Sequence, residues 1–140
     1  MTTVTRVAAF FYGSFMRREV LARGGHELRE FEVARLPGFD IHISPHASLS
    51  RSDQYSVYGI LVQLTHAELD RLYAMPGIGI FLPEAVLVQT RDGRHVPALC
   101  YIPPSREEKP ADREYLGHLV RVGREYGFPE WYIDRLANQP

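Results

Sequence analysis

Stretches of apolar residues divide the first third of the chain into short extended segments and one helix. Residues 4–12 are rich in Val, Ala and Phe, show no helical periodicity and end at a glycine, so they predict a buried strand. Residues 15–25 contain good helix formers and stop at two glycines, which predicts a short helix. Residues 31–36 and 39–44 form two further extended segments, separated by a Pro-Gly pair.

The middle of the chain contains a strand that is apolar on both of its alternating faces. This strand covers residues 55–64, and the polar residues 47–54 before it predict an exposed loop. A strand with two apolar faces is expected to be covered on both sides. Gly59 lies in the middle of this strand, where a glycine costs stability, so it indicates a bend or a close approach of another backbone segment.

Two local signals follow this strand. Thr65 and Glu68 have the spacing of a capping box, in which each side chain accepts a hydrogen bond from the other residue's amide, and they predict the start of a helix. Residues 80–90 and 94–102 are apolar runs joined by Arg-Asp-Gly. An Asp-Gly pair between two such runs predicts a β-hairpin.

The C-terminal third is predicted to be helical after a connector. Residues 103–110 are polar and rich in proline, Asp112 is placed to cap a long helix, and Gly127 is placed to end it. A last helical segment begins at Pro129. The tail, residues 137–140, is expected to be frayed.

Together these elements predict one domain with an α+β fold. A chain of 140 residues is long enough for one hydrophobic core and too short for two, which gives a single domain over residues 1–136. About six strands with short helices between only some of them favour a small mixed, partly closed β-barrel with peripheral helices over a repeated parallel βαβ arrangement.

Composition limits the classes of partner and chemistry. The formal charge is −1 and no run is rich in Lys or Arg, so no positive field is available to attract nucleic acid. No stretch approaches the length that spans a bilayer, and the N-terminal residues carry neither a basic leader nor a cleavage pattern, so a cytoplasmic protein is expected. Cys100, the single cysteine, is interpreted as a core thiol rather than a nucleophile, because it lies in an apolar run.

The turn formed by Tyr12, Gly13, Ser14 and Phe15 is the first candidate site. A strand that ends in glycine just before a helix exposes backbone amides without partners inside the helix, and such amides can hold a carboxylate or a developing oxyanion. Gly13 lets a ligand approach the main chain, and Ser14 adds a hydroxyl group. In the alternative interpretation, this turn only connects a strand to a helix.

Several segments, taken in order, resemble the γ-glutamyl cyclotransferase-like family. They are YGSF at residues 12–15, VYGILVQL with THAELDRLY at residues 57–73, the Asp-Gly strand pair, and EYGFPEWYIDRL at residues 125–136. The resemblance covers nearly the whole chain. It implies a small mixed β-barrel and an enzyme that, without a cofactor, converts a γ-glutamyl amide to 5-oxoproline and a free amine. It also implies that residues 12–15 hold the glutamyl group through main-chain amides.

This reaction requires a group that moves a proton. The α-amino nitrogen attacks a carbonyl group of the same molecule, and a base takes a proton from the α-ammonium group and returns it to the leaving amine. The resemblance implies a glutamate for this role, in a Glu-Gly pair just after the helix, but here Pro76 precedes Gly77. Glu84 is the candidate substitute, because it is the one carboxylate within the apolar strand of residues 81–89. Such a carboxylate either lies near a strand end in water or is desolvated, and in the second case its pKa rises toward the range of a general base.

Other aromatic and polar residues are secondary candidates. Tyr101 and Tyr132 are assigned to substrate binding with the turn, because their hydroxyl groups are able to line a pocket, and Tyr58 is a similar candidate. Aromatic residues in a chain with 8 Tyr and 7 Phe are also ordinary core residues. His42 and His46 suggest a metal pair, but a third ligand of suitable spacing is missing, so no metal site is predicted.

Three hypotheses about function follow from these residues. The first is a cyclotransferase-type enzyme acting on a small γ-glutamyl amide or amine conjugate, with Glu84 as the proton shuttle. The second is a binding module that holds a small carboxylate or amide ligand without chemistry, since Pro76 stands in the expected place of the acid-base residue. The third is a different acyl-transfer or ring-forming reaction. The expected partner is a small molecule in each case, and the sequence leaves the oligomeric state open.

Overall fold

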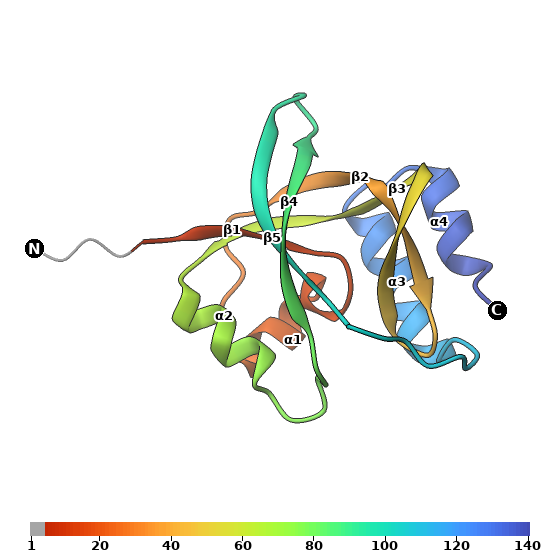
Figure 1. The fold of residues 1–140 in the computed structure, drawn as a ribbon, viewed down its shortest axis with the longest axis horizontal. Helices are drawn as coiled ribbons and strands as arrows, with labels where there is room; N and C mark the ends of the chain where they lie inside the picture. Colours follow the sequence, from red (N-terminus) through yellow and green to blue (C-terminus); the bar gives the residue numbers. More distant parts are fainter. Residues whose placement is uncertain (1–4) are drawn as a thin grey trace, which may run out of the picture.

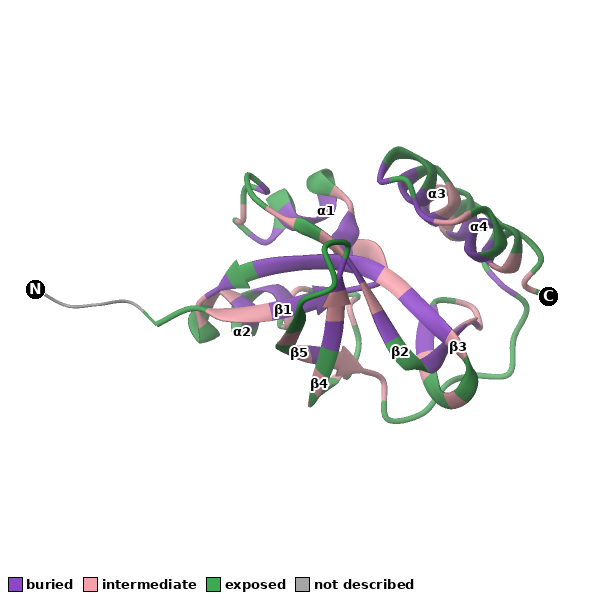
Figure 2. Ribbon diagram, turned by 90° about the horizontal axis from the view of Figure 1, so that it is seen from above, coloured by how far each residue is buried: buried purple, intermediate pink, exposed green. Residues whose placement is uncertain are grey.

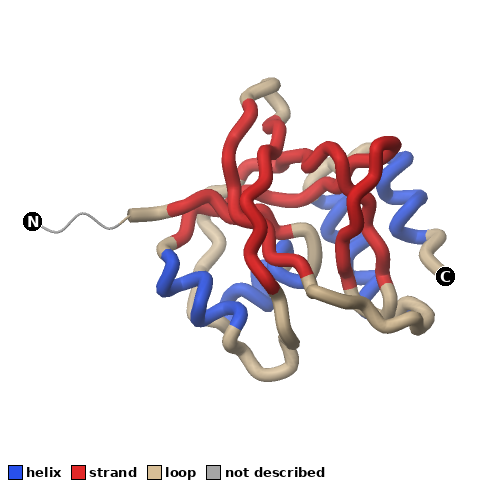
Figure 3. Tube along the Cα trace, in the orientation of Figure 1, coloured by secondary structure: helices blue, strands red, loops and turns tan. Residues whose placement is uncertain are grey.

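The strands form a closed barrel, and the helices lie at its periphery (Figures 1 and 3). The computed structural model describes residues 5–140, so Val4, the expected first residue of the first strand, lies outside the described residues. The strands are β1 (Val7–Phe11), β2 (Glu32–Ile43), β3 (Ala47–Leu64), β4 (Leu82–Thr90) and β5 (His95–Ile102). The helices are a short 3₁₀ helix (Ser14–Met16), α1 (Arg18–Arg23), α2 (His66–Tyr73), α3 (Arg113–Glu125) and α4 (Glu130–Ala137).

Strand β1 closes the barrel. The strand order is β1–β3–β2–β4–β5, and β1 pairs antiparallel with β3 on one side and parallel with β5, at Ala9 and Leu99, on the other. The remaining neighbours pair antiparallel. The predicted fold class, a small mixed α+β barrel with short peripheral helices, is therefore confirmed. The barrel of the described residues has five strands instead of about six, and it is closed instead of partly closed.

The lower strand count comes from the long hairpin of β2 and β3. The single strand β2 contains most of the two predicted segments, residues 31–36 and 39–44. A bulge between Pro37 and Phe39 accommodates the Pro-Gly pair within this strand. Gly38 adopts a φ of 85° at this bulge, which glycine tolerates. The prediction of a loop at residues 47–54 is wrong, because these residues are the first part of β3. Their backbone pairs with β2, and such pairing does not require apolar side chains.

Three local predictions are confirmed. Thr65 and Glu68 exchange capping-box hydrogen bonds of 2.9 and 3.1 Å at the start of α2. The Asp-Gly turn joins β4 to β5, and the amide of Gly93 donates to the carbonyl oxygen of Thr90 at 3.0 Å. Most side chains of residues 55–64 are buried, and Figure 2 shows this part of β3 in the colours of buried and half-buried residues.

Gly59 marks a close approach of two strands. A Cβ atom built on Gly59 would lie 2.2 Å from the carbonyl oxygen of Phe11 and 2.8 Å from Cζ of Phe10. A side chain at this position would therefore push β1 away from β3. The glycine lets β1 lie against β3 just before the chain leaves the barrel for the Tyr12–Phe15 turn.

The C-terminal helices lie beside the hairpin of β2 and β3 (Figure 1). Asp112 caps α3, its side chain accepting a hydrogen bond of 3.0 Å from the amide of Tyr115. The tail differs from the expected frayed segment. Ala137 is the last residue of α4, the Gln139 side chain accepts a 3.2 Å hydrogen bond from the amide of Ile43, and the carbonyl oxygen of Pro140 accepts one of 2.7 Å from Ala111. None of the helices in residues 5–140 is long and apolar enough to cross a membrane.

The close approach at Gly59 gives a first prediction. Gly59→Ala is expected to lower the free energy of unfolding by about 2 kcal/mol, because the new methyl group overlaps the Phe11 carbonyl. Gly117→Ala, in α3, is the matched control: a Cβ atom there meets nothing within 4 Å, so alanine should raise stability by up to about 1 kcal/mol. Urea denaturation of both variants measures the difference, and a Gly59→Ala variant as stable as the wild type would contradict the close approach.

Candidate functional site

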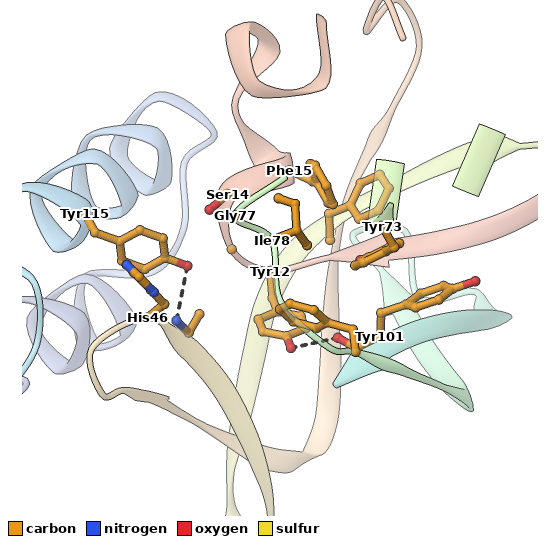
Figure 4. A pocket seen from close by; sticks show the side chains of 13 residues that line it. Tyr12, Ser14, Phe15, His46, Tyr73, Gly77, Ile78, Tyr101 and Tyr115 are labelled. Carbon is orange, nitrogen blue, oxygen red and sulfur yellow. Dashed lines mark hydrogen bonds between the residues drawn. The ribbon is translucent and has the colours of Figure 1, made fainter. Parts of the chain in front are cut away.

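A cavity of about 160 Å³ opens where β1 ends (Figure 4). Its wall combines residues from the end of β1, the start of β3, the end of α2 with the loop that follows, strand β5, and the first turn of α3. The lining residues are Phe11, Tyr12, Gly13, Ser14, Phe15, His46, Ala47, Tyr73, Gly77, Ile78, Phe81, Tyr101 and Tyr115. Five separate segments of the chain therefore meet at one place.

The Tyr12–Phe15 turn supplies main-chain amides to this cavity. The first hydrogen bond of the 3₁₀ helix runs from the amide of Met16 to the carbonyl oxygen of Gly13, at 3.0 Å. Because bonds in a 3₁₀ helix join residues three apart, the amides that come before Met16 have no acceptor inside this helix. The backbone of the turn thus offers hydrogen-bond donors next to the hydroxyl group of Ser14.

Tyr115 places a buried phenol against the same turn. Its Oη atom accepts a hydrogen bond of 3.2 Å from the amide of Ala47. Burial raises the pKa of Tyr115, and hydrogen bonds with Ala47 and Ser14 lower this pKa in part. A Cβ atom on Gly13 would lie 3.0 Å from the phenol oxygen, so a side chain at residue 13 would crowd it. The phenol oxygen therefore lies among hydrogen-bonding groups of β3 and of the turn.

Aromatic rings form the opposite wall. The rings of Tyr73 and Tyr101 are stacked with centroids 4.0 Å apart and planes inclined by 13°. Phe15 and Phe81 pack against Tyr73 with centroid distances of 5.1 and 5.4 Å. Tyr12 donates a hydrogen bond of 2.8 Å to the carbonyl oxygen of Tyr101, which ties β1 to β5 at the cavity. Burial raises the pKa values of Tyr12, Tyr73 and Tyr101, so these phenols are neutral at physiological pH.

His46 is the imidazole at the edge of the cavity. Its ring lies 4.8 Å from the ring of Tyr115, and the residue is largely exposed. His42, the other member of the suggested metal pair, does not line the cavity, and its Nε2 atom is 2.7 Å from Oγ of Ser50. Among residues 5–140, no three His, Cys, Asp or Glu side chains gather closely enough to hold a metal ion.

Five of the seven predicted site residues line the cavity: Tyr12, Gly13, Ser14, Phe15 and Tyr101. Tyr132 does not, because it lies on the buried face of α4, where its ring packs against Tyr58. Burial raises its pKa as well.

Glu84 also lies outside the lining of the cavity. It forms an ion pair with Arg51 of β3, and its side chain is 36% exposed. The predicted general-base role of Glu84 stays a prediction, and the position of its carboxylate gives that role no support. The segment around Arg51 was expected to be a loop. It is instead part of β3 and pairs with β2, and this pairing brings Arg51 close to Glu84.

Eight residues of the cavity lining were not predicted as site residues, and three of them carry ionisable side chains: Tyr73, His46 and Tyr115. Pro76, expected in the place of an acid-base residue, is exposed and lies outside the lining, whereas Tyr73 at the end of α2 faces the cavity. The sequence signal for Tyr73 was its place in the last turn of the capped helix. Tyr115 had a signal of the same kind, since it lies in the first turn after the Asp112 cap.

Cys100 is buried in β5, opposite Glu84 in the strand register, and it does not line the cavity. Burial, with a smaller contribution from the charge of Glu84, raises the pKa of its thiol to about 12. This environment agrees with a core thiol.

The raised pKa of Cys100 gives a second prediction. A thiol with a pKa near 12 is protonated at pH 8, so folded protein is expected to react with iodoacetamide at least about 100-fold more slowly than protein unfolded in urea. Labelling followed by mass spectrometry measures both rates. Rapid labelling of folded protein at pH 8 would contradict the buried position, whereas acceleration between pH 9 and pH 12 is expected as the thiolate forms.

Comparison with known proteins places this chain within a family. Residues 56–136, more than half of the chain, match the model of the AIG2-like family. None of the curated proteins matches the chain.

Three solved structures are similar in fold. A γ-glutamyl cyclotransferase has a TM-score of 0.81 and 20% identity, with 97% of this chain and 89% of that chain covered. The human protein loc79017 has a TM-score of 0.79 and 21% identity, with 96% and 88% covered. YkqA from Bacillus subtilis has a TM-score of 0.78 and 23% identity, with 94% of this chain and 53% of that chain covered. The chain belongs to the AIG2-like family and has the fold of γ-glutamyl cyclotransferase.

Proposed function

We propose that the chain binds a small ligand, through a carboxylate or amide oxygen of that ligand, in the cavity at the end of β1. The observation that carries this proposal is the position of Tyr115. Its phenol oxygen accepts from the Ala47 amide and lines the cavity together with the Tyr12–Phe15 turn, so a phenol hydroxyl group stands beside the amides and the hydroxyl group of that turn. Hydrogen bonds from such donors to a charged oxygen are stronger than those to a neutral one.

The ionisable side chains that face the cavity favour ligand binding over a cyclotransferase reaction in which a carboxylate is the base. They are one imidazole, His46, and the phenols of Tyr12, Tyr73, Tyr101 and Tyr115. Burial raises the pKa of each phenol, which makes them hydrogen-bond donors at neutral pH rather than bases. Glu84 is paired with Arg51 outside this lining.

The γ-glutamyl cyclotransferase reaction is the second candidate function. It is favoured by the similarity in fold to an enzyme of that name and by the place of the Tyr12–Phe15 turn at the cavity. Such a reaction needs a base near the α-ammonium group. An imidazole is a common general base, so His46 is the residue of this cavity that would act as the base in this reaction.

Binding is tested with propanoate as the probe, by isothermal titration at pH 7. Tyr115→Phe is expected to weaken binding at least about tenfold, because a hydrogen bond to a charged oxygen is lost. Tyr58→Phe removes a phenol oxygen outside the cavity lining and is the matched control, expected to bind like the wild type. Circular dichroism establishes that both variants are folded. Unchanged binding by folded Tyr115→Phe, or no binding by the wild type, would contradict the proposal.

Catalysis is tested with a panel of γ-glutamyl amines, by following 5-oxoproline. The proposed binding function predicts no release from any of them by folded protein. Release that His46→Gln abolishes and Glu84→Gln leaves unchanged would establish the second candidate instead. Release that only Glu84→Gln abolishes would restore the role predicted for Glu84 from the sequence.

A further inference from the structure

The cavity has two chemically different ends. Figure 4 shows Tyr115 and His46 on one side, and Tyr73 and Tyr101 on the other, with Ile78 between them. The first end presents the hydroxyl groups of Ser14 and Tyr115. The second end presents mainly the faces and edges of aromatic rings, those of Tyr73, Tyr101, Phe15 and Phe81. A ligand that fills the cavity therefore meets a polar surface with one part and an apolar surface with another.

The apolar end is built as a rigid aromatic surface. Tyr73 is stacked on Tyr101, while Phe15 meets it nearly at right angles, with an interplanar angle of 88°. Phe81 packs against Tyr73 as well. Rings held from several directions lose little further freedom when a ligand binds, and a flat ligand ring gains stacking or edge contacts with them.

The size of the cavity limits what the apolar end accepts. Its volume of about 160 Å³ is close to the roughly 150 Å³ of an engineered protein cavity that holds one benzene molecule. One ring with a short acidic side chain, whose carboxylate extends to the open polar rim, is therefore a suitable occupant. A long peptide or a nucleotide is not.

We infer that this cavity selects a carboxylate that carries one uncharged aromatic ring, the class represented by 3-phenylpropanoate. The ring packs against Tyr73, Phe15 and Phe81, and the carboxylate meets the hydroxyl groups of Ser14 and Tyr115. This inference rests on the proposed function, since it identifies the ligand class of the same site. An ammonium group next to the carboxylate disfavours binding, because the residues that line the cavity include no Asp or Glu to pair with a cation.

The inference is tested by titrating the protein with three probes that share one carboxylate and differ in one feature each. Compared with 3-phenylpropanoate, propanoate lacks the ring and L-phenylalanine adds an ammonium group. Binding of 3-phenylpropanoate is expected to be at least about tenfold tighter than binding of propanoate, since a buried ring gains hydrophobic free energy. It is expected to be about tenfold tighter than binding of L-phenylalanine, whose ammonium group loses hydration without a partner.

Two variants locate the ring within the cavity. Tyr73→Leu is expected to weaken binding of 3-phenylpropanoate at least about fivefold more than binding of propanoate, because only the first ligand has a ring that contacts this residue. Phe81→Leu, which changes a half-exposed ring, gives the same test if Tyr73→Leu does not fold. Tyr58→Leu changes a ring outside the cavity lining and should leave both affinities unchanged.

The outcomes separate the two proposals. Equal affinities for propanoate and 3-phenylpropanoate would overturn the inference and leave the proposed function standing. Affinity for L-phenylalanine equal to that for 3-phenylpropanoate would overturn the selection against a cation. Failure of all three probes to bind would overturn both the inference and the proposed function.

Discussion

The cavity depends on one buried phenol, that of Tyr115. Asp112 caps α3 through the amide of Tyr115, and its own amide donates to the carbonyl oxygen of Pro45, so the first turn of α3 is fixed beside the start of β3. From there Tyr115 accepts a hydrogen bond from Ala47 and lies against Gly13. Packing thus favours a glycine at residue 13, because a side chain there would crowd the phenol oxygen. These contacts join three segments that are distant in sequence.

The other half of the cavity depends on how the barrel closes. β1 contacts β3 through the close approach at Gly59 and contacts β5 through the parallel pair of Ala9 and Leu99. The hydrogen bond from Tyr12 to the carbonyl oxygen of Tyr101 extends this closure to the mouth of the cavity. The stacked rings therefore have a fixed position relative to the turn, and a rigid surface of this kind favours selection by shape.

The fold and the chemistry of the site are separable in this protein. The barrel is that of γ-glutamyl cyclotransferase, and the turn at residues 12–15 lines the cavity. The side chains opposite the turn are mainly aromatic. Because function depends on the residues of the site and not on the fold that carries them, the same barrel is able to serve a ligand of different charge.

Local sequence patterns predicted much of the fold and one side of the site. The capping box of Thr65 and Glu68, the Asp-Gly hairpin and the close approach at Gly59 depend on a few neighbouring residues or on the special geometry of glycine. The ion pair of Glu84 with Arg51 and the stack of Tyr73 on Tyr101 join segments far apart in sequence. Such contacts depend on which segments come together in the folded chain. Residues 47–54 show that a polar sequence gives no sign that a segment pairs as a strand. The place of Tyr73 and Tyr115 in the cavity could not be predicted, because the segments that they meet there are also far away in the sequence.

The most direct measurement of the central claim is the change in backbone amide chemical shifts when propanoate is added to ¹⁵N-labelled protein. The account predicts that the largest changes fall on Gly13, Ser14, Phe15 and Ala47, which line the cavity together with Tyr115. Changes centred instead on Arg35 and Arg91, which line a separate cleft between β2 and β4, would contradict it.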